Sequence, residues 1–171
     1  GATSITVEIQ HGGISYIRVT DDGCGIERDD VKTAFVSHAT SKIKTAEDLN
    51  TILTLGFRGE ALPSVAAVSK VNMITKTADE EMGTTITIEG GIITDFSDAG
   101  CAVGTTMIVR ELFYNTPARM KFLKKDVSEG NFVAAAVEKL ALSHPEISIR
   151  FIRDGKQVFT TNGDGNLQNV C

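Results

Sequence analysis

The chain has 171 residues, of which 42% are hydrophobic and 23% charged, and its net charge is −5. This balance predicts a single globular domain over residues 1–171 and excludes an intrinsically disordered chain. The acidic charge excludes a domain that holds nucleic acid by bulk charge alone. The apolar runs are far shorter than the ~20 residues of a membrane helix, so we expect no membrane contact.

The first third of the chain predicts a β-hairpin followed by a helix. Residues 4–10 alternate between apolar and polar side chains, and residues 14–20 do the same after Gly12 and Gly13. This alternation around a glycine turn is typical of two paired strands. Residues 27–36 then carry apolar side chains at helical spacing.

Residues 37–59 have weak periodicity, and a helix is expected again over residues 60–69. More than 20 residues without a strong element are uncommon inside a compact domain, and such segments are often functional. We therefore expect a lid over residues 37–59.

The rest of the chain is rich in predicted strands. Strands are expected over 71–77, 84–89, 92–96, 105–110, 147–152 and 157–161. Gly90-Gly91 and Asp154-Gly155 are hairpin turn signals between neighbouring strands.

Two helices are predicted between the fourth and fifth of these strands. Asn115-Thr116-Pro117 starts a short one, since it offers a cap followed by proline at the first helical position. Ser128 is expected to cap a longer one that ends before His144-Pro145. Its inward side chains should be Phe132, Val133, Ala136, Val137 and Leu140.

These elements predict an α/β (α+β) two-layer sandwich, in which helices cover one face of a mixed, mostly antiparallel sheet. Phosphate-binding P-loop, dinucleotide-binding, nucleophile-elbow and EF-hand patterns do not occur in the sequence. The three cysteines lie far apart in the chain, and the histidines are scattered. The sequence therefore predicts no metal site within the chain, and a reducing, cytoplasmic setting.

Four segments are candidates for a nucleotide site. Asp21, with Gly23 and Gly25 after it, can accept a hydrogen bond from an exocyclic amine while a flat ring lies on the loop. Thr40, Ser41 and Lys42 are suited to phosphate oxygens.

Gly56, Phe57, Arg58 and Gly59 precede a predicted helix, where free backbone N–H groups bind anions. Gly104 and Thr105 open a strand. Each segment alone is also compatible with an ordinary turn, polar loop or cap, but their order describes a purine nucleotide pocket without a P-loop.

These motifs resemble a known family. The matching segments are Asp21-x-Gly23-x-Gly25, 39–43, 56–62 and 112–119, and they resemble the N-terminal ATPase domain of the MutL DNA mismatch-repair proteins. That domain has the Bergerat, or GHKL, fold shared with gyrase B, a heat-shock chaperone and histidine kinases. The last two segments are close to specific for MutL-type proteins.

The resemblance implies a role for each matching residue. Asp21 would bind the adenine amino group, Gly25 would support the ring, and Thr105 would assist at the adenine end. Thr40, Ser41 and Lys42 would belong to an ATP lid, and residues 56–59 would offer N–H groups to the phosphates. Lys124 matches a basic position that family members use toward DNA; a solvated helix end is the alternative.

The resemblance also implies ATP and Mg²⁺ as cofactors. Its general-base Glu and Mg²⁺-binding Asn belong to a helix that would precede Gly1, so we expect the chain to be part of a longer protein and to lack this helix. We therefore expect impaired hydrolysis, and uncovered apolar side chains on the first two strands, at Ile5, Val7 and Ile9 or their neighbours Ile17 and Val19. If the chain does hydrolyse ATP, Glu60 is the first candidate base.

For the parent protein the resemblance implies an ATPase in the bacterial cytosol. ATP would drive its homodimerisation and couple the mismatch-recognition protein MutS and DNA to strand nicking. Two alternatives stay open: a non-catalytic nucleotide-binding or interaction fragment, and another GHKL ATPase of the type II topoisomerase or chaperone kind.

Overall fold

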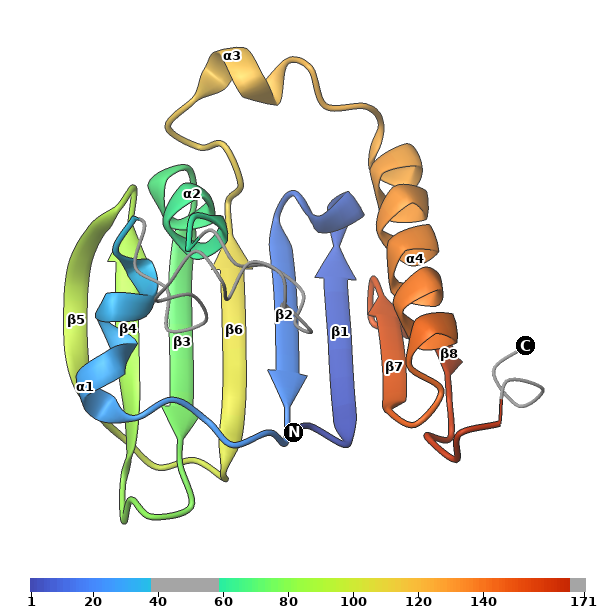
Figure 1. The fold of residues 1–171 in the computed structure, drawn as a ribbon. Coiled ribbons are helices and arrows are strands. Elements are labelled where there is room, and N and C mark those ends of the chain that lie inside the picture. Colours follow the sequence, from blue (N-terminus) through green and yellow to red (C-terminus); the bar gives the residue numbers. More distant parts are fainter. Residues whose placement is uncertain (38–58, 167–171) are drawn as a thin grey trace, which may run out of the picture.

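In the computed structural model, which describes residues 1–37 and 59–166, eight strands form one mixed sheet (Figure 1). Its strands are β1 (Ser4–Gln10), β2 (Tyr16–Asp21), β3 (Lys70–Lys76), β4 (Gly83–Glu89), β5 (Ile92–Ala99), β6 (Gly104–Arg110), β7 (Ser148–Arg153) and β8 (Lys156–Thr160). Their order across the sheet is β5-β4-β3-β6-β2-β1-β7-β8. Every neighbouring pair is antiparallel except β1 and β7, which run parallel. The predicted mixed, mostly antiparallel sheet is confirmed.

The helices α1 (Arg28–Val31), α2 (Ala61–Ala67) and α4 (Asp126–Ser143) lie on one face of this sheet (Figure 1). Two short 3₁₀ turns complete the described elements: η1 (His11–Gly13) lies between β1 and β2, and η2 (Thr33–Phe35) follows α1. Helix α3 (Pro117–Met120) lies in the arch that connects β6 to α4 beyond the end of the sheet. The predicted two-layer sandwich is therefore confirmed.

The core lies between the sheet and these helices, in two clusters. One contains Val31, Ala66, Val71, Met73, Ile86, Ile88 and Val109, under α1 and α2. The other contains Ile9, Val137, Ala141, Ile149 and Phe151, under α4. Ile17 on β2 packs against both clusters, so the central strands join the two halves of the core.

Two helical predictions differ from the structure. The helix expected over 27–36 is split into α1 and η2, because Phe35 N–H bonds to Lys32 O and Val36 N–H to Thr33 O, which is the tighter 3₁₀ spacing. The helix expected from Ser128 begins earlier, after Lys125, so Ser128 lies inside its first turn.

The predicted inward face of α4 is wrong in part. Phe132 and Leu140 are 58% and 44% exposed, whereas Gly130, Val137 and Ala141 are buried. A helix places residues three, four and seven apart on one side, and this buried set follows that spacing from Gly130. The expectation of an uncovered strand 4–10 is also wrong at Ile9, which α4 and β7 bury completely.

Candidate nucleotide site

Asp21 is the last residue of β2 and lies on the helix-covered face of the sheet. It follows Ile17 and Val19 at two-residue spacing, so all three point to the same side. Across the sheet Asp21 is in register with Ile5 and with Thr105. Its half-buried carboxylate accepts the Gly23 N–H at 2.8 Å through Oδ1. This hydrogen bond closes a local turn directly after the strand.

Two of the sequence-predicted residues, Asp21 and Thr105, are therefore neighbours. Thr105 is in register with Thr75 on its other side. The Thr75 and Thr105 hydroxyls lie 3.0 Å apart, and Ile26 N–H donates to the Thr75 hydroxyl at 2.9 Å. A row of oxygen atoms thus crosses three strands at the end where the Asp21 loop begins.

Glycine is required at two positions of this site. Gly25 has φ +73°, and a Cβ there would overlap the Lys76 carbonyl. Gly104 has φ +120°, and a Cβ there would overlap the Asp21 carbonyl. The loop after Asp21 and the start of β6 can approach their neighbours only because these residues have no side chain.

Asp22, the next carboxylate, points away from this row. It accepts hydrogen bonds from Thr3 Oγ1 at 2.6 Å and from the N–H groups of Thr3 and Ser4 at 2.7 and 2.8 Å. The Thr3 hydroxyl, followed by these N–H groups, lowers the pKa of Asp22 to about 2. Asp22 is therefore an anchor for the start of β1, while Asp21 faces the site.

Helix α1 is held beside the site by Glu80. The Glu80 carboxylate accepts Arg28 N–H at 3.0 Å and Thr77 N–H at 3.1 Å, and these bonds lower the pKa of Glu80. The Arg28 side chain forms an ion pair with Asp98 and lies over the Phe96 ring. The chain that follows the Asp21 loop is thus tied to β3, β4 and β5.

The predicted phosphate-binding residues precede α2 in the chain, and only the last of them belongs to the described part. Thr40, Ser41, Lys42, Gly56, Phe57 and Arg58 lie outside the described residues. Gly59 has φ +63° and comes two residues before α2. Glu60 is the N-cap residue of α2 but makes no side-chain cap.

Lys124 is exposed and lies in the arch between α3 and α4, with its ammonium 4.8 Å from the centre of the Phe132 ring. This arch is at the opposite end of the sheet from Asp21 (Figure 1). The structure therefore keeps the candidate DNA contact and the candidate adenine contact apart. The predicted helix start at Pro117 is confirmed, but the side-chain cap is wrong: Asn115 Nδ2 donates to the Ala67 carbonyl, and Thr116 Oγ1 has no partner among the described residues.

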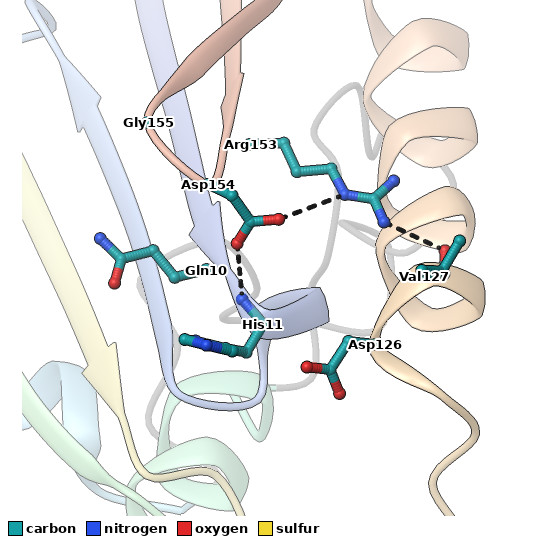
Figure 2. Close-up of a pocket in the computed structure, with 7 residues that line it drawn as sticks. All are labelled: Gln10, His11, Asp126, Val127, Arg153, Asp154 and Gly155. Carbon is teal, nitrogen blue, oxygen red and sulfur yellow. Dashed lines mark hydrogen bonds and ion pairs between the residues drawn. The ribbon is translucent and has the colours of Figure 1, made fainter.

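A cavity of about 550 Å³ lies at the far end of β1, where Gln10 pairs with Tyr16 (Figure 2). His11 N–H donates to Asp154 Oδ1 at 2.9 Å, and Arg153 approaches Asp154 Oδ2 at 3.7 Å and the Val127 carbonyl at 3.3 Å. Figure 2 shows these groups directed at one another across the cavity. They fasten the β7–β8 turn to η1 and α4, and we assign no ligand to them.

Among residues 1–37 and 59–166, His, Cys, Asp and Glu side chains form no group of three that could hold a metal ion. Within the same residues, no helix is long and apolar enough to cross a membrane.

No family model matches the chain, but comparison with known proteins finds similar sequences among DNA mismatch repair proteins. The DNA mismatch repair protein MutL of Agathobacter rectalis is 55% identical over 170 residues, which are 99% of this chain and 26% of that protein. MutL of Thermoanaerobacter pseudethanolicus is 51% identical over 99% of this chain and 28% of its own length. The chain thus spans about a quarter of these curated relatives.

Similar folds are also found among solved structures of DNA repair proteins. The Aquifex aeolicus MutL ATPase domain complexed with ADP superposes with a TM-score of 0.76 and 30% identity, over 99% of this chain and 59% of that one. An N-terminal domain of a DNA repair protein superposes with a TM-score of 0.78 and 25% identity, over 99% of this chain and 50% of that one.

Proposed function

Since this chain corresponds to the N-terminal GHKL ATPase domain of the MutL family, we propose that it binds ATP in the pocket that begins at Asp21. The observation that carries the proposal is the register of Asp21 with Thr105 at the edge of the glycine loop. The similarity to a MutL ATPase domain complexed with ADP supports it.

We assign recognition of the adenine base to three described residues, Asp21, Gly25 and Thr105. The Asp21 carboxylate accepts a hydrogen bond from the adenine amino group, because an ionised carboxylate can only accept. Gly25 leaves the loop flat against the ring, and Thr105 adds a hydroxyl oxygen beside Asp21. The phosphates are bound by Gly59, before α2, and by Thr40, Ser41, Lys42 and residues 56–58, of which all but Gly59 lie outside the described residues.

Hydrolysis of ATP to ADP and phosphate is the activity we propose for the parent protein. In the family that the motifs resemble, the general base and the metal ligand belong to a helix that would precede Gly1, and we propose this placement for the parent protein. Loss of a positioned general base costs ~10²–10⁴ in rate. A phosphate-release assay on the chain with and without its natural upstream residues tests this assignment, and Glu60→Gln is the first variant to measure if the chain alone is active.

The remaining parts of the proposal concern the whole protein. In the whole protein, ATP binding promotes homodimerisation in the cytoplasm. This ATP-dependent dimerisation links mismatch recognition by MutS, and contact with DNA, to strand nicking. Lys124 is the candidate DNA contact of this domain, because it is exposed in an arch that carries other lysines.

Nucleotide titration of Asp21→Asn tests the base-recognition step. The substitution keeps the size of the side chain but replaces one acceptor oxygen by a donor group. An unpaired polar group in a buried site costs roughly 1–3 kcal/mol, so the ATP affinity should fall by roughly 5- to 150-fold. Calorimetry measures the change.

Asp22→Asn is the matched control. It alters the adjacent carboxylate, which faces Thr3 and Ser4 rather than the site, so the ATP affinity of the folded variant should equal that of the unsubstituted chain. Equal affinities for all three proteins would remove Asp21 from this role.

A further inference from the structure

Thr75 is a polar residue at a core position. It follows Val71 and Met73 on β3 at two-residue spacing, and all three side chains are buried, with Thr75 0% exposed. A hydroxyl loses its water there and must find partners within the protein. Thr75 finds three.

These partners belong to the two segments that form the adenine end of the site. Ile26 N–H, in the loop after Asp21, donates to Thr75 Oγ1 at 2.9 Å. Thr75 Oγ1 donates to the Gly104 carbonyl at 3.1 Å and lies 3.0 Å from Thr105 Oγ1. One buried hydroxyl therefore joins β3, the glycine loop and the start of β6.

We propose that Thr75 is a positioning residue of the nucleotide site, which fixes the glycine loop and the Thr105 hydroxyl and so determines selectivity for adenine over 6-oxopurines. The inference rests on the proposed ATP-binding function. Thr75 acts through Ile26 and Thr105 and does not itself touch the nucleotide.

The direction of the hydrogen bonds gives the selectivity. A hydroxyl has one proton, and we assign the Thr75 proton to the Gly104 carbonyl, because a carbonyl can only accept whereas the Thr105 hydroxyl can donate. With that assignment, Thr105 donates its own proton to Thr75 across the 3.0 Å contact and presents only lone pairs to the site, as the Asp21 carboxylate does. Two acceptors suit a 6-amino group and repel a 6-oxo group.

Thr75→Val removes the hydroxyl while it keeps the shape of the side chain. The Thr105 hydroxyl is then free to rotate and donate to a 6-oxo group, and Ile26 N–H loses its acceptor. We expect the ATP affinity to fall by about tenfold, and the ratio of ATP to ITP affinity to fall by about threefold or more. Thr75→Ser keeps the hydroxyl and should restore both values.

Thr84→Val is the matched control. Thr84 is 1% exposed and in register with Thr75, but its hydroxyl accepts only a long bond from Arg28 Nη1, at 3.4 Å, among the contacts of the described residues. It should lower the melting temperature as a buried substitution does and leave the ATP to ITP ratio unchanged. If Thr75→Val does not fold, Thr75→Ala removes the same hydroxyl without placing a methyl group where the oxygen was.

Calorimetric titration of ATP and ITP into the chain and these variants decides the question, with Asp21→Asn measured first. If Asp21→Asn binds ATP normally, the proposed function fails before Thr75 is considered. If Asp21→Asn weakens ATP but the Thr75 variants keep the original ratio, the inference about Thr75 alone is overturned. An equal loss of selectivity in Thr84→Val overturns it too, since the effect would then be general.

Discussion

Two adjacent carboxylates, Asp21 and Asp22, have different roles because Asp21 is the last residue of β2, whereas Asp22 follows the strand and is held by Thr3 and Ser4. Asp21 continues the helix-covered side of β2 and faces the candidate site. Asp22 is turned to the first residues of β1, where three hydrogen bonds hold it. At the scale of single residues, one step along the chain at the end of β2 separates a candidate ligand contact from a structural anchor.

The depressed pKa of Asp22 predicts a specific loss of stability in acid. The carboxylate has a pKa of about 2 in the folded chain and an ordinary value of 3.8. A group whose pKa is lowered by folding stabilises the fold above its unfolded value, and this contribution is lost as the pH falls through the folded value. The contribution of Asp22 should therefore disappear between about pH 4 and pH 2.

Urea unfolding of the chain and of Asp22→Asn at a series of pH values measures this contribution. The variant should be less stable at pH 7, and the difference between the two should narrow below pH 4. Glu80 and Glu146, whose pKa values are also lowered, are present in both proteins, so their losses cancel in the comparison. A difference that stays constant down to pH 2 would contradict the assignment.

At the scale of elements, the loop between β2 and α1 depends on the close packing of Gly25 against β3. Gly25→Ala should move this loop away from Lys76, because the new Cβ would overlap the Lys76 carbonyl. Positive φ adds about 1–2 kcal/mol of strain for a residue with a side chain. We expect ATP binding to be lost, as measured by fluorescent-nucleotide titration.

Gly155→Ala separates backbone strain from packing. Gly155 has φ +76°, almost the same as Gly25, but a Cβ there would meet nothing within 4 Å. It lies in the β7–β8 turn, at the opposite end of the sheet from Asp21. Because of the backbone strain, Gly155→Ala should lower the melting temperature, but it should leave the ATP affinity unchanged. If Gly155→Ala and Gly25→Ala lose similar amounts of ATP affinity, packing at Gly25 has no special role.

At the scale of the whole molecule, the sheet carries two core clusters, and Ile17 on β2 packs against both of them. Ile9 on β1 belongs to the cluster under α4, and Ile86 on β4 belongs to the cluster under α1 and α2. Four strand spacings separate β1 from β4, which is about 19 Å at ~4.8 Å per spacing. Substitutions at that distance without a shared partner normally add.

Ile9→Val and Ile86→Val test this independence. Both side chains are 0% exposed, and each substitution should cost about 0.5–1.5 kcal/mol of unfolding free energy. The double variant should lose the sum within about 0.5 kcal/mol. Urea unfolding measures all three, and a larger departure would mean that Ile17, which packs against both clusters, couples them strongly.

The sequence by itself determined the elements that depend on local pattern. The strands at 4–10 and 84–89 follow from alternation, and the Gly90-Gly91 and Asp154-Gly155 turns follow from residues that tolerate positive φ, which all four adopt. Asp21 and Thr105 could be selected because each belongs to a short motif at a strand end. These features are set by neighbours a few residues away, so one chain segment contains the information.

Only the tertiary structure decided how distant segments meet. Parallel pairing of β1 with β7 brings residues about 140 apart into register, and α4 covers that pair with the face that begins at Gly130. Thr75 also could not be assigned in advance: its alternation with Val71 and Met73 marks a polar side chain at a core position, but its partners come from two other segments. A buried hydroxyl needs hydrogen-bond partners, and for Thr75 these partners come from segments that only the pairing of distant strands brings close.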